Sequence, residues 1–236
     1  SAYLFLGNYS EAIIHLTKAL DIQISTSGKF TDSVLTILDN LSFAYELNEQ
    51  IEKSLHYYME SISISKKINS ETHPKSLQLF ERIGILLDKH GNQEAALDYL
   101  YHALNIRFEI AEKEHLSNGP LPTFELANLY NEIGSIHFSL GDYEDAEQMI
   151  NNSINIISDV EEEHPLLSKW FYHLGIVYRR LNKNDKVLDC YLTSLNHMLK
   201  HYNENSIEVA EAYKRIADTY TALGEKELAH EAYLKF

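Results

Sequence analysis

The sequence predicts an all-α fold, a right-handed superhelical solenoid of antiparallel helix pairs. Three observations lead to this prediction: a pattern that recurs about every 42 residues, apolar residues at helical spacing within each recurrence, and few helix-breaking residues. The 236 residues include nine Gly and four Pro, too few for a β-rich protein, whose turns and bulges use both. Hydrophobic residues make up 44% of the chain, enough for a continuous core.

One position in each recurrence marks a tight turn and is held by glycine or a substitute for it. These turn residues are Gly7, Glu49, Gly91, Gly141, Asn182 and Gly224, at intervals of 42, 42, 50, 41 and 42 residues. The positions 11, 8, 7 and 4 before each turn residue follow the i, i+3, i+4, i+7 spacing of one helix face. Each turn residue is therefore expected to join two antiparallel helices, helix A before it and helix B after it.

Small residues recur at fixed places on both helices. Seven positions before the turn residue lie Ser42, Gly84, Gly134, Gly175 and Ala217. Five positions after it lie Ala12, Ser54, Ala96, Ala146, Val187 and Ala229. Small side chains let two helix backbones approach, so these columns are expected to face each other within a pair. Neither helix can bury its apolar stripe alone, and successive pairs are expected to stack into one core.

In order along the chain, the expected pairs form a single array over residues 1–236, with the ranges 1–31, 32–73, 74–122, 123–164, 165–205 and 206–236. Pro74 and Pro165 are expected at the first position of a helix A, where a missing N–H costs nothing. The one long interval contains residues 112–124, which we predict to be an extended loop, either a tolerated insertion or a contact loop. Ser1 falls within a helix A and Phe236 within a helix B, so a fragment of a longer chain is expected.

These columns resemble the tetratricopeptide repeat, most closely in YNEIGSIHFSLGDYEDAEQMINNSI (130–154) and LGNYSEAIIHLTKAL (6–20). The usual period of that repeat is about 34 residues, and the longer period here adds about one turn to each helix. Repeats of this length resemble those of the kinesin light chain, in which a His-Pro pair opens helix A. Such pairs occur here in ETHPKSLQLF (71–80) and EEEHPLLSKWF (161–171). The resemblance implies a non-catalytic module that binds other proteins.

Composition narrows the classes of partner. The net charge of −15 and the pI near 5.2 argue against nucleic acid or an anionic membrane as the main partner. No stretch approaches the roughly 18 apolar residues of a membrane span, and no secretion signal opens the chain. The single cysteine, Cys190, excludes an internal disulfide and fits a reducing compartment, so a cytoplasmic location is expected. The oligomeric state is left open.

Motifs for catalysis are not found. The chain has no Gly-rich phosphate loop and no G-x-S-x-G elbow, and Cys190 has no recognisable catalytic context. His197 and His201 are four residues apart, as two metal ligands on a helix would be, but a third ligand is not evident. We therefore expect neither an enzyme nor a metal or cofactor site.

A binding surface is expected on the face of helix A that turns away from the core. Positions 13, 10, 9, 6, 3 and 2 before each turn residue lie on that face, which should line the concave groove of the solenoid. The expected partner-binding residues are Asn40, Phe43, Arg82, Asn131, Phe138, Lys169, Tyr172, His173, Arg179, Arg180, Lys214 and Arg215. The resemblance to light-chain repeats implies a column of peptide-holding Asn residues, which is matched here by Asn40, with Asn131 one place away.

Basic residues of this face concentrate in its C-terminal half, at Lys169, Arg179, Arg180, Lys214 and Arg215. Two explanations are open: these cations pair with neighbouring Glu and Asp, or they bind acidic side chains or a C-terminal carboxylate of a partner. The aromatic and aliphatic residues of the face, such as Tyr172 and Phe138, are either partner pockets or loosely filled core.

Three functions remain. The first is a scaffold that binds a peptide or helix of a partner protein in its groove. The second is a structural segment of a larger assembly, with the groove filled by the same chain. The third is a bacterial peptide-pheromone sensor, a family that also uses long helix pairs.

Overall fold

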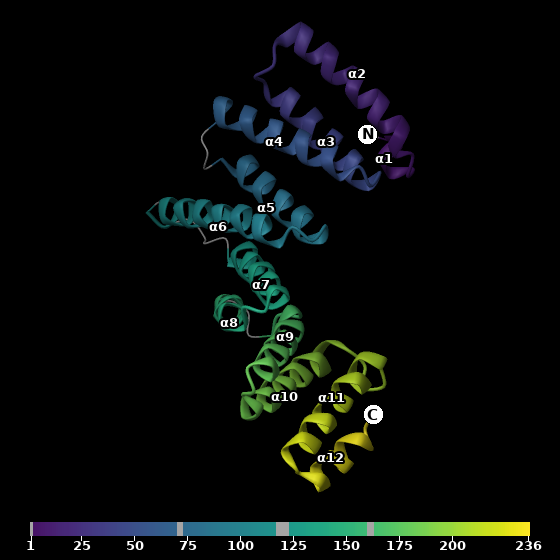
Figure 1. Cartoon of the computed structure of the whole chain (residues 1–236), viewed down its shortest axis with the longest axis vertical. Coiled ribbons are helices and arrows are strands. Elements are labelled where there is room, and N and C mark those ends of the chain that lie inside the picture. Colours follow the sequence, from purple (N-terminus) through teal and green to yellow (C-terminus); the bar gives the residue numbers. More distant parts are fainter. Residues whose placement is uncertain (1, 70–72, 117–122, 160–162) are drawn as a thin grey trace. The chain divides into compact units, whose positions relative to one another are not determined.

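The computed structural model describes residues 2–69, 73–116, 123–159 and 163–236, and within these ranges every regular element is a helix (Figure 1). The predicted all-α fold is confirmed. Of the expected loop at 112–124, residues 117–122 lie outside the described residues. The prediction is wrong for the others, because residues 112–116 continue one helix and residues 123 and 124 begin the next. Among the described helices, none combines the length and the apolar content of a bilayer span.

Contacts between residues divide the chain into two compact units, Ser1–Pro120 and Leu121–Phe236, called the N-terminal and C-terminal units below. The helices of the N-terminal unit are α1 (Ala2–Phe5), α2 (Tyr9–Ser27), α3 (Asp32–Leu47), α4 (Ile51–Ile68), α5 (Pro74–Lys89) and α6 (Gln93–Leu116). Those of the C-terminal unit are α7 (Thr123–Leu140), α8 (Tyr143–Ser158), α9 (Leu166–Arg180), α10 (Asn184–His201), α11 (Ile207–Leu223) and α12 (Lys226–Tyr233). The single array over residues 1–236 stays a prediction.

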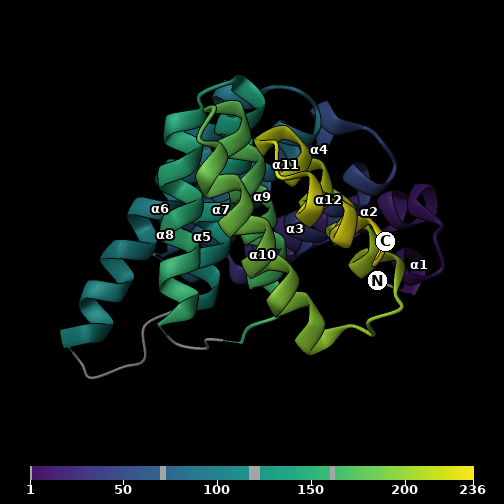
Figure 2. The same cartoon turned by 90° about the horizontal axis from the view of Figure 1, so that it is seen from below.

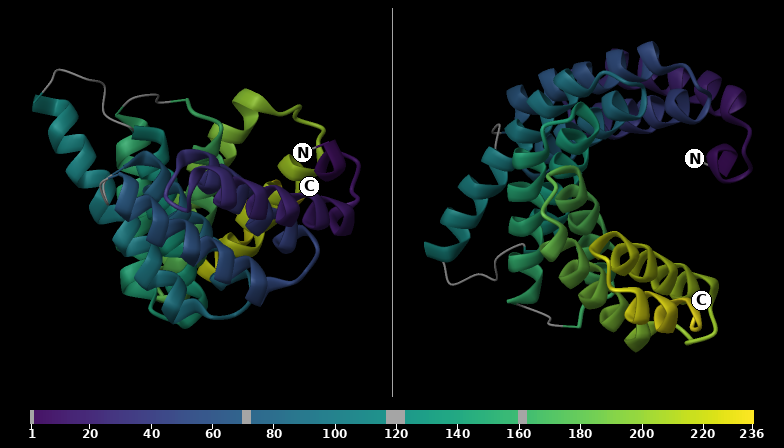
Figure 3. Two further views of the ribbon diagram at one scale, coloured as in Figure 1. Left: turned by 90° about the horizontal axis from the view of Figure 1, so that it is seen from above. Right: turned by 60° about the horizontal axis from the view of Figure 1, so that its bottom comes forward.

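Within each unit, consecutive helices pack as pairs, and each pair packs on the next (Figures 2 and 3). Helices α3, α5, α7, α9 and α11 are the A helices, and each packs on the helix that follows it. Helix B of one pair then contacts helix A of the next, as in α4 with α5, α8 with α9 and α10 with α11. This order places the grooves between neighbouring A helices on one side of each unit.

The turn residues explain why the chain reverses where it does. All six turn residues of the recurring pattern have a positive φ, including the two that are not glycine, Glu49 at 57° and Asn182 at 56°. A left-handed residue ends a helix by letting the following amide bond back to the last turn, as Asp142 N–H does to the carbonyl of His137 at 2.9 Å. The turn residues predicted from the sequence therefore coincide with the left-handed residues at which the helices end.

The small-residue columns are where the helices of a pair approach most closely. A Cβ placed on Gly175 would lie 2.4 Å from Cε1 of Tyr191 on α10, and one on Gly134 would lie 2.8 Å from Cγ1 of Ile150 on α8. In the pair α3–α4 the Ser54 hydroxyl instead donates to the backbone carbonyl of Ser42 at 2.9 Å. A larger residue at these places would push the pair apart.

The two His-Pro pairs begin helices by the same contact. The Nδ1 atom of His73 accepts the amide N–H of Lys75, and that of His164 accepts the amide N–H of Leu166, each at 3.2 Å. Pro74 begins α5 as expected, whereas α9 begins one residue after Pro165. An imidazole two residues before the amide thus satisfies one of the free donors of the first turn.

Candidate partner-binding surface

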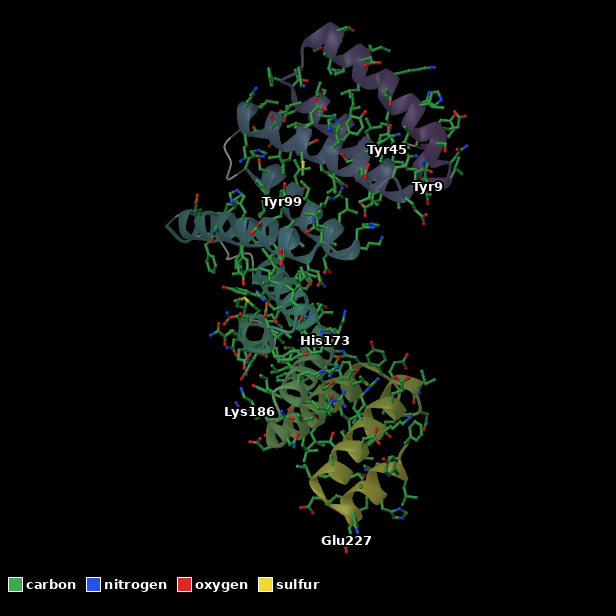
Figure 4. The ribbon with its side chains drawn as sticks, viewed as in Figure 1. Tyr9, Tyr45, Tyr99, His173, Lys186 and Glu227 are labelled. Atoms are coloured by element: carbon green, nitrogen blue, oxygen red, sulfur yellow. The ribbon has the colours of Figure 1, made fainter. Side chains whose placement is uncertain are left out.

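Helices α8 and α9 of the C-terminal unit carry charged residues of opposite sign. Helix α9 carries Lys169, Arg179 and Arg180 and no acidic residue, whereas α8 carries Glu144, Asp145 and Glu147 (shown with its neighbours in Figure 4). This segregation matters because the unit as a whole is acidic, with 10 basic and 19 acidic residues in 121–236 by count of the sequence. Three of the ten basic residues therefore lie on one A helix that has no acidic residue.

A first pocket, the α7/α9 pocket, lies between two neighbouring A helices and has a volume of about 280 Å³. Its walls are Ser135, Phe138, Ser139, Ile150, Tyr172, His173, Ile176 and Val177. Phe138, Tyr172, His173 and Ile176 are half-buried, so the pocket presents apolar surface that the unit itself does not cover. An apolar side chain of another molecule would bury the part of these residues that is still exposed.

His173 lines this pocket as a neutral group. Burial, with the positive charge of Lys169 adding to it, lowers the pKa of His173 to about 4. Figure 4 labels His173 on α9. A neutral imidazole has one donor and one acceptor nitrogen, so it suits a polar uncharged group of a ligand better than an anion.

A second pocket, the α9/α11 pocket, lies between α9, α10 and α11 and has a volume of about 230 Å³. Its walls are Ser168, Lys169, Tyr172, Tyr191, Ser194, Met198, Tyr202, Glu208, Ala212 and Arg215. Tyr172 belongs to both pockets, so its ring forms the wall between them. The Arg215 guanidinium lies 4.5 Å from the centroid of that ring and bonds Glu211 at 2.7 Å.

The five basic residues of the expected face differ in whether an acidic side chain neutralises them. Arg215 has an acidic partner, and the Lys214 ammonium lies 5.4 Å from the ring centroid of Phe236. Lys169, Arg179, Arg180 and Lys214 form no ion pair within 4.0 Å with any residue that the structure describes. Four of the five cations are therefore available to an anion from outside.

In the N-terminal unit, the corresponding groove is already occupied by its own ion pairs. A pocket of about 230 Å³ between α3 and α5 is lined by Leu35, Thr36, Asp39, Lys75, Gln78, Leu79 and Arg82. Arg82 lies 3.3 Å from both Asp39 and the buried hydroxyl of Tyr58, and its guanidinium is 5.6 Å from the ring centroid of Phe43. Lys75 is paired with Asp32 at 3.6 Å.

The two expected Asn residues do not face outward freely. The side-chain amide of Asn40 donates to the carbonyl of Thr36 at 2.8 Å within its own helix. Asn131 is only 5% exposed and lies under the surface, with its Oδ1 atom lacking a hydrogen-bond partner among the described residues. The backbone-holding role that the light-chain resemblance implied for this column is therefore not available to Asn131 in this conformation.

Sequence reasoning placed Lys169, Tyr172 and Arg215 on the expected face but missed the residues of α10, and Glu208 and Ala212 of α11, that also line the α9/α11 pocket. Tyr191 and Met198 come from α10, and Tyr202 follows it. The expected face was defined on A helices alone. The one signal in the sequence was Tyr191, a large residue on the helix that packs against Gly175. No spacing in the sequence indicates Glu208 on the following helix.

The cysteine and the two histidines considered as catalytic or metal-binding candidates have structural surroundings of their own. Burial raises the pKa of the Cys190 thiol to about 12, so it is not a ready nucleophile. His201 bonds the backbone carbonyl of Glu163 at 2.8 Å, and His197 stacks on Phe171 at 5.7 Å between ring centroids. Among the described residues, no group of three His, Cys, Asp or Glu side chains is placed to hold a metal ion.

A stack of antiparallel helix pairs with left-handed turn residues at a fixed period defines a helical repeat protein. The sequence profile of the tetratricopeptide repeat matches residues 1–67, 33–107 and 125–200. The chain belongs to the tetratricopeptide repeat family.

Kinesin light chain-related proteins are among its relatives, as the repeat length suggested, and so is Response regulator aspartate phosphatase E of Bacillus subtilis, 24% identical over 139 residues. The chain is 21% identical over 195 residues to Protein Kinesin Light Chain-Related 1 of Arabidopsis thaliana, covering 81% of this chain and 30% of that protein. It therefore spans less than a third of the length of this relative. The crystal structure of a Podospora anserina kinesin light chain with nearly identical repeats matches with a TM-score of 0.67 at 16% identity, covering 85% of this chain and 92% of the other.

A second solved structure, BtubC (BKLC) from P. vanneervenii, matches with a TM-score of 0.71 at 13% identity, covering 95% of this chain and 87% of the other. At this identity the likeness shows the fold alone. The predicted fold class, a solenoid of tetratricopeptide-like helix pairs, is confirmed. The family and the fold together support a scaffold that interacts with other proteins.

Proposed function

We propose that the C-terminal unit is a non-catalytic, cytoplasmic binding module that holds a peptide or helix of a partner protein along α7, α9 and α11. The observation that carries this proposal is the coincidence of half-buried apolar surface with unpaired cations on the same A helices. Apolar surface drives association, and the cations select a partner with acidic side chains or a C-terminal carboxylate. The paired charges of α3 and α5 make the N-terminal unit the weaker candidate.

The two pockets give the proposal its geometry. Phe138, His173 and Ile176 would take an apolar anchor of the partner, and Tyr172 separates it from the cations Lys169 and Arg215. A bound segment would therefore place an apolar and an acidic group on the two sides of one tyrosine ring. Aromatic residues and Arg are the residue types that most often carry binding energy in interfaces.

A peptide-display selection tests the proposal directly. The parent chain is compared with the variant Arg180→Glu/Lys214→Glu/Arg215→Glu at low and high salt. A matched control, Lys18→Glu/Lys53→Glu/Lys226→Glu, makes the same change in net charge at exposed residues of α2, α4 and α12, which are not A helices. We expect the parent and the control to select acidic peptides at low salt, and the first variant to lose them.

One outcome would move the anchor, and two others would favour the other functions. Selection of the same peptides by both variants would exclude Arg180, Lys214 and Arg215 as the anchor. Selection of nothing by the parent would favour the structural segment, which binds only with its flanking sequence. Short, uncharged peptides that bind in one register would favour the pheromone sensor.

A further inference from the structure

The hydroxyl of Tyr191 is the least expected feature of the C-terminal unit. The Tyr191 side chain crosses Gly175 of α9, the residue is 3% exposed, and its hydroxyl has no hydrogen-bond partner among the described residues. A buried hydroxyl without a partner is costly, and native structures rarely keep one without a use. Tyr191 also lines the α9/α11 pocket, so a group bound there is placed to accept this hydrogen.

The charges around this hydroxyl indicate the kind of acceptor. Burial raises the pKa of Tyr191, while the guanidiniums of Arg179 and Arg215 act in the opposite direction, so both lie within electrostatic reach of the ring. Lys169 adds a further cation at the pocket and has no acidic partner among the described residues. An acceptor that bears negative charge satisfies the hydroxyl and these cations together.

Apart from Glu208 and two serines, the rest of the pocket is lined mainly by apolar surface. Tyr172, Met198, Tyr202 and Ala212 contribute ring, thioether and methyl surface around the polar groups. The two serines add little free polarity, because the Ser194 hydroxyl already donates to the carbonyl of Ser168 at 2.6 Å. At about 230 Å³ the pocket is smaller than the roughly 300–1,000 Å³ of pockets for drug-sized ligands, so it suits one side chain.

We propose that the α9/α11 pocket binds the free α-carboxylate of an apolar or aromatic residue, with the carboxylate accepting from Tyr191 and facing Arg215 and Lys169. An internal Asp or Glu side chain would bring a carboxylate but leave the apolar walls uncovered. This chemistry has two sources, the last residue of a partner polypeptide and a free amino acid. Glu208 lies in the same pocket and would favour the free amino acid by accepting its ammonium group.

The inference rests on the proposed function, because it names the anchor of that binding surface, and it is tested separately from it. The probes are N-acetyl-phenylalanine, free phenylalanine and N-acetyl-phenylalanine amide, titrated into the whole chain and followed by NMR. The first carries only the carboxylate, the second also the ammonium, and the third neither. We expect the amide to bind at least tenfold more weakly than the better of the other two.

The source follows from the same titration. Tighter binding of N-acetyl-phenylalanine would identify the end of a polypeptide, and tighter binding of phenylalanine would identify a free amino acid. Equal binding of the amide would overturn the proposal. Binding of no probe would also overturn it, while peptides selected by display would still show the proposed function to be intact.

The substitution Tyr191→Phe separates a ligand role from a structural one. It removes only the hydroxyl and keeps the ring against Gly175, so the melting temperature should stay the same or rise. Affinity for the carboxylate probe should nevertheless fall about tenfold, as expected for loss of one hydrogen bond to a charged group. The control Tyr213→Phe changes a half-buried tyrosine of α11 outside the pocket and should leave affinity unchanged. Unchanged affinity in Tyr191→Phe would show that the hydroxyl plays no part in binding.

Discussion

The two units are built from the same kind of helix pair, yet the basic residues of their grooves differ in whether they form ion pairs. On α3 and α5 the groove cation Arg82 is held by Asp39 and Tyr58, and Lys75 is held by Asp32. On α9, Lys169, Arg179 and Arg180 have no acidic partner among the described residues. The repeat fold therefore fixes where the groove lies, and the pairing of charges decides which part of it is open to a partner.

The largest effect is expected where the helices of a pair meet most closely. Gly175→Ala places a methyl group against the rigid ring of Tyr191, 2.4 Å from Cε1, and should lower the free energy of unfolding by about 2–3 kcal/mol. The matched change in the N-terminal unit, Gly84→Ala, meets the aliphatic Leu100 side chain at 2.6 Å and the backbone oxygen of Ala96 at 3.2 Å. It should cost about 1–2 kcal/mol, because an aliphatic side chain can rotate aside where a ring cannot. Urea unfolding of both variants checks the order.

A larger loss in Gly84→Ala would contradict this account. It would mean that the rigidity of the facing side chain is not what limits the approach of the helices.

The next effect is the pH dependence of the unfolding free energy, which we expect from His173 of the C-terminal unit. Because the folded pKa of His173 is about 4, below the ordinary value of 6.5, the unfolded chain binds the proton first as pH falls. Stability from this residue is complete above about pH 6.5 and is lost between there and pH 4, by about 1–2 kcal/mol after allowance for partial exposure. His173→Asn should remove this part of the pH dependence, measured as the difference in unfolding free energy between pH 7 and pH 4.5.

His15, an exposed histidine of the N-terminal unit, provides the control. His15→Asn should leave the pH dependence of the parent. An identical pH profile in the parent and His173→Asn would show that other groups cause the loss of stability at low pH.

A smaller effect separates paired from unpaired arginines. Arg82→Ala removes a half-exposed ion pair and a bond to the buried Tyr58 hydroxyl, and should cost about 1 kcal/mol. Arg179→Ala and Arg180→Ala should each change stability by less than about 0.5 kcal/mol, since these exposed side chains have no ion pair to lose within the described residues. Equal costs at all three positions, measured by thermal unfolding, would remove the distinction between the units.

The sequence predicted much of the fold because its repeat depends on local conformation. Glu49 and Asn182 were assigned as turn residues by register alone, and both have the left-handed backbone that the position requires. Helix starts are less certain by one residue, as Pro165 shows: its backbone is already helical, with φ −56° and ψ −31°, yet the helix begins at Leu166.

The surface was less predictable because it depends on partners distant in the chain. Arg82 meets Asp39, which is 43 residues away, and no spacing within one repeat shows this. Asn131 follows the register of an exposed face but is buried by its neighbours. The pocket around Tyr191 combines three helices, and a face drawn on A helices alone omits α10.

The central claim is that the partner segment binds on the C-terminal unit and not on the paired groove of the N-terminal unit. Hydrogen exchange measured with and without a display-selected peptide tests it most directly. The account predicts slower exchange in α7, α9 and α11 on binding, with no change in α3 and α5. Slower exchange in α3 and α5, with α9 and α11 unaffected, would contradict it.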